Sequence, residues 1–323
     1  MPAVTHTPLG QEHPYETLPE ERSPRMPLAG QPFTVGITTR PPGLAQRVVV
    51  HSEIDGVPQP AINATRKEEW RPEWEEGVGA EYLERKIVID QDVWQAQMTA
   101  PEHGKTLTYW VESDAGTTGK YTVRGESWLP ASADSSPKIT VHGTQMPTLR
   151  SIERLTDGVR SRRVRLTFEA APEEGFFGFG ERFNALDQRG NVMDIRVYEQ
   201  YKNQGKRTYM PVPFLLSSRR YGLWVESARW MQFDLCASSP DVWVLEADLG
   251  PDETLSLHWF AGKDAFDVIG QFARATGPGS EYASPLPPEW AFGLWMSAND
   301  WNSQERVEKE VAASFAHGIE PTV

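Results

Sequence analysis

The segment VRLTFEA, residues 164–170, places apolar side chains at every second position, at Val164, Leu166 and Phe168. Successive side chains of a β-strand point to opposite faces of the sheet, so this period of two predicts a strand with one face in a core. The same alternation recurs within residues 138–260, at Leu223 and Val225, Trp243 and Leu245, and Leu255 and Leu257. This block is therefore predicted to form a large all-β sandwich.

A smaller block of alternating residues precedes the large sandwich. Phe33, Val35 and Ile37 are spaced by two, and turn-forming Pro, Asp and Gly residues separate such runs. We predict a small antiparallel β-sandwich over residues 31–128, with an accessory role.

Two further segments flank the small sandwich. Residues 129–137, LPASADSSP, have the Pro, Ser and Asp content of a linker. Residues 1–30 are rich in Pro and Glu and show no apolar periodicity, so we expect a poorly ordered tail.

A helix is predicted at the C-terminal end of the next domain, residues 138–284. Asp264 is suited to cap the N-terminus of this helix, and Gly277-Pro278 is suited to end it. Spacings of three and four predict one apolar face, made of Phe266, Ile269, Phe272 and Ala273.

The last forty residues have a different pattern. AFGLWMS (291–297) is almost continuously apolar, which favours a strand buried on both faces of a parallel sheet. Asn302 is predicted to cap a helix with Glu305 at its third position, and Gly318 to end it. The apolar stripe of this helix is Val307, Val311 and Phe315, and residues 319–323 are predicted to begin another strand. One strand–helix–strand unit buries too little surface to be stable alone, so we expect residues 285–323 to start a domain that continues beyond Val323.

Composition argues against several classes of function. The formal net charge of −13, from 45 acidic and 32 basic residues, disfavours a nucleic-acid partner. Cys236 is the single cysteine, which excludes an intrachain disulfide, and the seven His lack the spacing of a metal site. We therefore expect neither a metal nor a cofactor. The first residues lack the pattern of a secretory signal and no apolar run is long enough to cross a membrane, which predicts a cytoplasmic location without a membrane partner.

Three segments resemble glycoside hydrolase family 31, in that family's order. FFGFGERFNALDQRG (176–190) is similar to the G-x-G-E and L-D-Q-R-G segment of the family's N-terminal sandwich. MPVPFLLSSRRYGLWVES (210–227) is similar to the strand pair that follows it. PPEWAFGLWMSANDWNSQERVEKEV (287–311) resembles the family's entry into a (β/α)₈ barrel. The resemblance covers about half of the chain, residues 160–323.

The resemblance implies a mostly β fold and a retaining α-glycosidase. The fold would be tandem β-sandwiches, the second galactose-mutarotase-like, followed by the first strand and helix of a truncated (β/α)₈ barrel. In such an enzyme one carboxylate attacks the anomeric carbon and a second, protonated carboxyl group donates to the leaving oxygen. In the family both are Asp residues of later barrel strands, which are expected beyond Val323. We therefore assign no catalytic residue to this chain and expect the chain alone to be inactive. We expect the full-length enzyme to act like an α-glucosidase or α-xylosidase. Homo-oligomerisation of that enzyme stays open.

Two groups of residues are candidates for contacts with a carbohydrate substrate. Barrel active sites lie at the C-terminal ends of the strands, where Trp rings pack on sugar C–H groups and Asn or Asp bind hydroxyls. Asn299, Asp300 and Trp301 follow the first predicted barrel strand. Family members also extend a loop from the sandwich to the barrel mouth, and the corresponding residues here are Glu199, Gln200, Tyr201, Lys202 and Gln204. The alternative interpretations are a core position for Trp301, a helix-end role for Asp300 and a solvated hairpin for the loop.

Several polar segments and the chain as a whole also have structural or non-catalytic interpretations. The loop also holds Lys206 and Arg207, a basic content that would suit an anionic sugar. Glu181 and Arg182 are interpreted as structural groups that pair or bind backbone. Asp187, Gln188 and Arg189 are interpreted as a turn whose side chains tie the sandwich to the barrel. A non-catalytic carbohydrate-binding protein of tandem sandwiches is the alternative function. A mutarotase-like epimerase would need paired His and Glu, and His142 and His258 show no recognisable pairing in the sequence.

Overall fold

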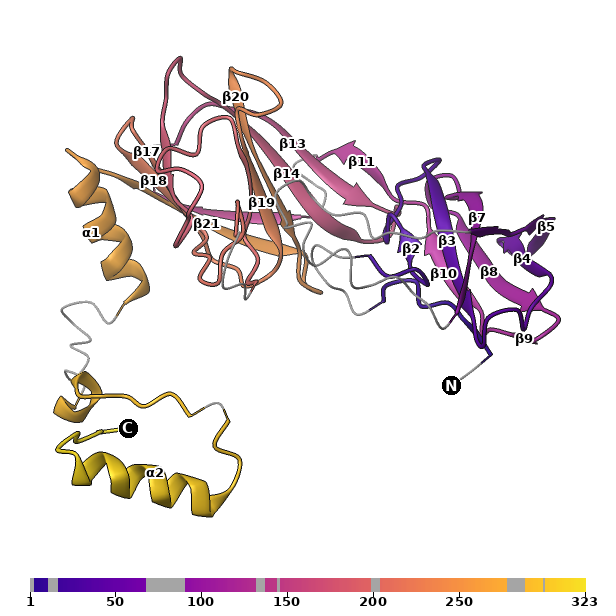
Figure 1. The fold of residues 1–323 in the computed structure, drawn as a ribbon. Coiled ribbons are helices and arrows are strands. Elements are labelled where there is room, and N and C mark those ends of the chain that lie inside the picture. The colour runs from indigo at the N-terminus through magenta and orange to yellow at the C-terminus, as the bar shows by residue number, and fades with distance from the viewer. Residues whose placement is uncertain are drawn as a thin grey trace. The chain divides into compact units, whose positions relative to one another are not determined.

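The computed structural model describes residues 3–10, 17–67, 91–131, 137–143, 146–198, 204–277, 288–298 and 300–323. The chain divides into two compact units, Met1–Phe272 and Ala273–Val323. In its described residues the first unit contains two β-sandwiches, each with its own cluster of buried apolar side chains. Figure 1 shows the strands of the first sandwich in indigo and purple and most strands of the second in magenta and orange.

The first sandwich packs one antiparallel sheet against another. One sheet contains, in spatial order, β1 (Val4–Thr5), β3 (Pro32–Thr39), β7 (Asp92–Thr99) and β6 (Thr65–Lys67), with β2 (Arg22–Ser23) also paired to β3. The other contains β10 (Tyr121–Arg124), β8 (Thr106–Ser113), β4 (Val48–Ile54) and β5 (Val57–Asn63), with β9 (Gly116–Thr117) paired to β8. Phe33, Val35 and Ile37 all lie in the core, which confirms the strand predicted from their alternation.

The N-terminal residues belong to this sandwich. Val4 pairs with Thr39 and Arg22 pairs with Val35, so both short strands extend the sheet of β3. His6 is buried, and its ring nitrogens lie 2.6 Å from the Gly36 carbonyl oxygen and 2.9 Å from the Tyr109 hydroxyl. The prediction of a poorly ordered tail is therefore wrong for residues 3–10 and 17–30. Two-residue strands are too short to show a period, and polar contacts hold this segment instead.

The second sandwich also packs sheet on sheet. One sheet is antiparallel and contains β11 (Ser127–Pro130), β13 (Leu149–Thr156), β14 (Ser161–Glu169), β20 (Val242–Asp248), β19 (Met231–Leu235) and β16 (Val192–Asp194), in that order. The other contains β12 (Lys138–His142), β21 (Thr254–Ala261), β18 (Tyr221–Val225), β17 (Phe214–Ser217) and β15 (Phe176–Gly178), with β12 parallel to β21. All the alternating residues predicted for this block lie in one core, which confirms a mostly β fold.

The boundary between the sandwiches differs from the prediction. β11 pairs with β13, so Leu129 and Pro130 belong to an edge strand of the second sandwich. The Arg162 guanidinium also contacts the Glu126 carboxylate at 2.8 Å, just before this strand. The predicted linker therefore cannot begin at residue 129, and residues 132–136 lie outside the described residues. Proline is tolerated in an edge strand, so a Pro-containing composition does not distinguish an edge strand from a linker.

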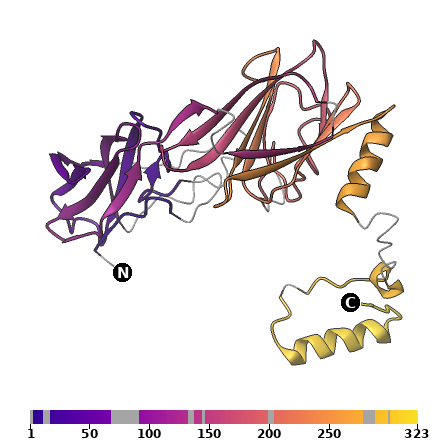
Figure 2. The same cartoon turned by 180° about the vertical axis from the view of Figure 1, so that it is seen from behind.

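Helix α1 (Ala265–Thr276) follows β21 and lies beside the sheet of β17, β18 and β21 (Figures 1 and 2). Asp264 Oδ1 accepts a hydrogen bond from the Asp267 amide at 2.9 Å, which confirms the predicted cap. Val268 is fully buried, and Phe272 stacks on Phe214 with ring centroids 4.1 Å apart. Phe266 is 86% exposed, so the predicted apolar face is wrong in part. The helix turns the i, i+4 pair of Val268 and Phe272 toward the sheet instead.

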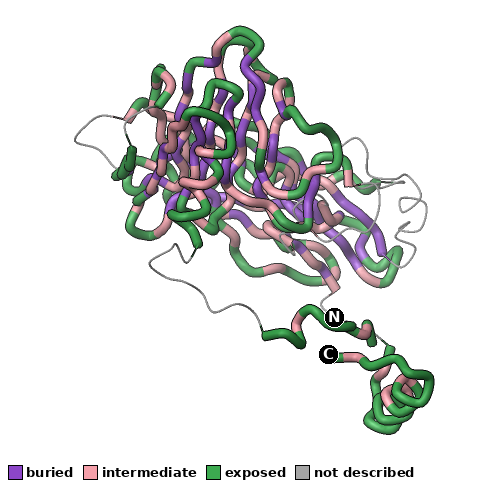
Figure 3. Tube along the Cα trace, turned by 90° about the vertical axis from the view of Figure 1, so that its left-hand side faces the viewer, coloured by how far each residue is buried: buried purple, intermediate pink, exposed green. Residues whose placement is uncertain are grey.

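The second unit contains a 3₁₀ turn, Glu289–Phe292, and helix α2 (Gln304–Ala316). Ser303 Oγ accepts from the Arg306 amide at 3.2 Å, so α2 is confirmed but the predicted cap, Asn302, is wrong by one position. The predicted strand over residues 291–297 is also not formed along its length, since Leu294 makes an isolated parallel bridge with Pro321. A strand needs a hydrogen-bonding neighbour along its whole length, and the single bridge from Pro321 is too little to form one. Figure 3 shows exposed and intermediate residues along α2 and buried residues along the strands of the first unit.

Candidate functional site

The sequence-predicted substrate contacts fall into both units of the chain. Asp300 is exposed and Trp301 is half-buried, and they lie just before the Ser303 cap of α2. Gln204 lies in the first unit, where its carbonyl oxygen accepts from the Arg207 amide at 2.9 Å. Five further candidates lie outside the described residues: Glu199, Gln200, Tyr201, Lys202 and Asn299.

The loop around Arg207 is less cationic at its surface than its composition suggests. Arg207 is buried, and its guanidinium lies over the Tyr198 ring, 5.3 Å from the centroid. The carbonyl of Lys206 accepts a hydrogen bond from Arg182 at 2.7 Å. Arg207 is therefore a packing residue, which weakens the case for an anionic sugar.

Arg182 of the GERF segment has the predicted structural role, and Asp187 of the LDQRG segment also bonds to backbone groups of the sandwich. The Arg182 guanidinium donates to the carbonyl oxygens of Phe179 at 3.0 Å, Lys206 at 2.7 Å and Asp194 at 3.1 Å. Asp187 Oδ1 accepts from the amides of Phe176 and Arg189, both at 2.9 Å. These side chains satisfy backbone groups, so they are not free to act on a substrate.

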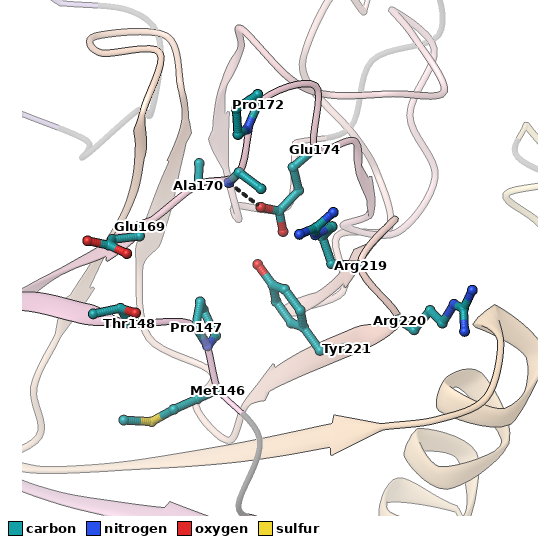
Figure 4. Close-up of a pocket in the computed structure, with 11 residues that line it drawn as sticks. Met146, Pro147, Thr148, Glu169, Ala170, Pro172, Glu174, Arg219, Arg220 and Tyr221 are labelled. Atoms are coloured by element: carbon teal, nitrogen blue, oxygen red, sulfur yellow. Dashed lines mark hydrogen bonds between the residues drawn. The ribbon is translucent and has the colours of Figure 1, made fainter.

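A pocket of about 530 Å³ in the second sandwich was not anticipated from the sequence. Residues before β13, after β14 and around the β17–β18 turn line it (Figure 4): Met146, Pro147, Thr148, Glu169, Ala170, Ala171, Pro172, Glu174, Arg219, Arg220 and Tyr221. These segments are distant in sequence, and the pairing of β14 and β17 with their neighbours brings them together. Its size is within the range of small-molecule sites.

Glu174 is the most deeply buried carboxylate of this pocket, with 3% of its surface exposed. One carboxylate oxygen accepts from the Ala171 amide at 2.8 Å and the other from the Ser217 hydroxyl at 2.5 Å. The backbone carbonyl of Glu174 also accepts from the Arg189 guanidinium at 2.9 Å. Hydrogen bonds to a carboxylate offset part of the cost of burying its charge, so these contacts stabilise Glu174 in its buried position.

Tyr221 lies opposite Glu174 in the same pocket. It is 8% exposed, and its hydroxyl has no hydrogen-bond partner among the described residues. Burial, together with the nearby negative charge of Glu174, raises the pKa of the Tyr221 hydroxyl, so the phenol is neutral. Glu174, Arg219 and Tyr221 point toward one another in Figure 4. A buried hydroxyl without a partner costs about 1–3 kcal/mol, which a water or a ligand hydroxyl in this pocket would offset.

A smaller pocket of about 440 Å³ lies over the GERFNAL segment. Gly178 and Gly180 form part of its wall, with Arg182 and Gln188. Phe183 and Leu186 line it and are exposed to solvent. The side chains of Arg182 and Gln188 already donate to backbone carbonyl oxygens, those of Phe179 and Ala185 respectively.

His142 and His258 are adjacent in the structure, contrary to the sequence interpretation. They are direct partners across β12 and β21, and their rings stack with centroids 4.3 Å apart. Trp224 is the partner of His258 on β18 and stacks at 4.5 Å, while Glu226 Oε2 lies 2.9 Å from His258 Nε2. Because β21 lies between β12 and β18, the His258 ring has an aromatic neighbour on either side. This ladder is a cross-strand packing arrangement, so the His–Glu pairing by itself does not support an epimerase.

The described residues contain no group of three or more His, Cys, Asp or Glu side chains placed to hold a metal ion. None of the helices in the described parts of the chain is long and apolar enough to span a membrane.

Comparison with known proteins connects the chain to one family of enzymes. A family described as glycosyl hydrolase 31 N-terminal galactose mutarotase-like domain matches residues 60–234, and one described as Lmo2446-like, N-terminal matches residues 5–70. The chain is 29% identical to an isomaltosyltransferase from Sporosarcina globispora, over 99% of this chain and 36% of that protein. It is 30% identical to a 1,3-alpha-isomaltosidase from Kribbella flavida, over 94% of this chain and 40% of that protein.

A solved structure shows the same architecture. The cycloalternan-degrading enzyme from Trueperella pyogenes, in complex with a covalent intermediate, superposes with a TM-score of 0.73 and 28% identity. The match covers 98% of this chain and 44% of that one. The chain thus spans less than half the length of these relatives.

Proposed function

Because this chain belongs to glycoside hydrolase family 31, we propose that it forms the N-terminal part of an enzyme that acts on isomaltosyl units of α-glucans. The observation that carries the proposal is the extent of the similarity. Both relatives whose names mention isomaltosyl groups match more than nine-tenths of this chain, so the likeness includes the first sandwich. A non-catalytic binding protein is disfavoured, because these two relatives, which match more than nine-tenths of the chain, are enzymes.

The proposed reaction retains the configuration of the anomeric carbon. A carboxylate attacks that carbon and forms a glycosyl–enzyme ester, while a second carboxyl group protonates the leaving oxygen. Water then attacks the ester in hydrolysis, or a sugar hydroxyl attacks it in transfer, with the second group now acting as base. The covalent intermediate of the Trueperella pyogenes enzyme supports this route. We propose that both carboxylates lie outside residues 1–323, since the relatives are more than twice as long.

The second unit is proposed to be the first strand and helix of the catalytic barrel. A parallel bridge from Leu294 to Pro321 on either side of α2 supports this, because neighbouring barrel strands are parallel. Asn299, Asp300 and Trp301 would then lie at the mouth of the barrel and contact the sugar. The loop residues Glu199, Gln200, Tyr201, Lys202 and Gln204 are proposed to reach the same mouth from the sandwich.

A panel of aryl α-glycosides tests the proposal. The protein assayed is the longest natural polypeptide that contains residues 1–323, and residues 1–323 alone are the matched control. We expect the longer protein to release the aryl group from an α-isomaltoside at least about tenfold faster than from an α-xyloside, and the control to release none. Proton NMR of the first product should show the α-anomer. Preference for the xyloside, or a β-anomeric first product, would contradict the proposal.

A further inference from the structure

We infer that the pocket between Glu174 and Tyr221 is a binding site for a neutral sugar ring. It lies wholly within the second sandwich, and the proposed reaction does not use its residues. The identification of a sugar ring rests on the chemistry of the pocket. Its assignment to a glucosyl unit of an α-glucan rests on the proposed function.

The charges of the pocket favour an uncharged ligand. Its lining includes two Glu and two Arg, so the formal charges of these side chains cancel. Glu169 is also paired with Arg150, at 3.4 Å, on the outer side of β14. An anion would approach the buried Glu174 carboxylate, and a cation would approach Arg219 and Arg220. A ligand of either sign would therefore meet a like charge.

The hydrogen-bonding groups match those of a polyol. Tyr221 presents a hydroxyl without a partner, which is able to donate to or accept from a ligand hydroxyl. The Glu174 oxygens each accept one protein hydrogen bond and retain a lone pair for another donor. Arg219 has guanidinium donors at the rim, since its side chain is exposed. A sugar ring presents adjacent hydroxyls that both donate and accept, and would satisfy these three groups together.

The remaining lining suits the C–H groups of the same ligand. Met146, Pro147 and Pro172 add apolar surface to the lining. Sugars present C–H groups and hydroxyls on the same ring, so they need both kinds of surface. A volume of about 530 Å³ is large enough for a small ligand and too small for a long polymer, so one end of a chain or a single unit would enter.

Ligand-observed NMR and calorimetry with residues 1–323 test this inference. Isomaltose is the probe, and xylose, glucuronate and magnesium chloride are the comparisons. We expect millimolar binding of isomaltose, with no binding of glucuronate or magnesium. Tyr221→Phe removes one hydroxyl that has no protein partner, and should weaken isomaltose binding by about tenfold without lowering the unfolding temperature. Arg219→Gln should weaken it as well. Tyr209→Phe is the matched control, because Tyr209 is exposed and does not line the pocket.

The outcomes separate this inference from the proposed function. If isomaltose binds equally to the parent, Tyr221→Phe and Arg219→Gln forms, the pocket is not the site and the inference fails. It fails as well if no neutral sugar binds, even where the longer protein cleaves an isomaltoside. If xylose binds in a Tyr221-dependent way and isomaltose does not, the sugar site stands and the assignment to isomaltosyl glucans is wrong.

Discussion

Protonation of His6 should destabilise the first sandwich at mildly acidic pH. Burial lowers the pKa of His6 to about 4 in the folded state, against 6.5 for an exposed histidine. Its ring packs edge-on against Tyr121, with centroids 4.8 Å apart, and both ring nitrogens face protein oxygens. At neutral pH the ring is uncharged in both states, so it carries no penalty. As pH falls below the unfolded pKa, the unfolded state binds the proton first, and stability is lost until the folded pKa is reached.

The size of the effect follows from the two pKa values. A difference of this size corresponds to about 3 kcal/mol once pH is below both values, and to about 2 kcal/mol at about pH 5. Urea unfolding of the parent chain and of His6→Gln at about pH 8 and about pH 5 measures it. Burial also raises the pKa of Glu21, which opposes the His6 effect, so the difference between parent and variant is the quantity to compare.

The matched control is His51→Gln, since His51 lies on the same sandwich and is partly exposed beside Glu112. We expect His51→Gln to lose stability between the two pH values as the parent does, and His6→Gln to lose about 2 kcal/mol less. Equal losses in the parent and His6→Gln, or a His6 NMR titration near the ordinary histidine value, would refute the reasoning.

Two further substitutions probe the second sandwich and the second unit. Gly180→Ala would place a Cβ 2.0 Å from the Met210 carbonyl oxygen, at a residue whose φ is +83°, so urea unfolding should show a loss of about 3 kcal/mol in the free energy of unfolding. The control is Gly190→Ala, which has the same sign of φ but no atom within 4 Å of the new Cβ, and it should lose about 1 kcal/mol. Equal losses in the two variants would exclude the clash. Ser303→Ala should reduce amide hydrogen-exchange protection in the first turn of α2 by about fivefold, because it removes the helix cap. Asn302→Ala should leave this protection unchanged. A loss of protection in Asn302→Ala and not in Ser303→Ala would show that Asn302 is the cap.

The sequence predicted the parts of the candidate site that follow from local signals. Arg182 is predicted to be a structural group, and the structure confirms its bonds to backbone carbonyl oxygens. Asp187 and Arg189 also bond to backbone groups, and their predicted tie between the sandwich and the barrel stays a prediction. Asp300 and Trp301 were located by their place after a predicted strand, and their contact with sugar stays a prediction.

No local signal in the sequence predicted the pocket of Glu174 and Tyr221. Its walls come from three separate stretches of the second sandwich, and an isolated Glu or Tyr in a loop has no spacing that marks it. The adjacency of His142 and His258 was hidden for the same reason, since it depends on the parallel register of β12 and β21. Register is set by competition among all possible pairings, which a single strand does not reveal.

The alternation at Val164, Leu166 and Phe168 determined by itself that this region forms strands with one buried face, because burial acts on each strand separately. Short sequence segments likewise indicated the family to which the chain belongs. Tertiary structure alone decided that residues 3–10 and 17–30 are ordered, that β11 belongs to the second sandwich and that α1 buries Val268. Each of these depends on contacts between residues far apart in the chain, whose free energy is gained only after the intervening loops close.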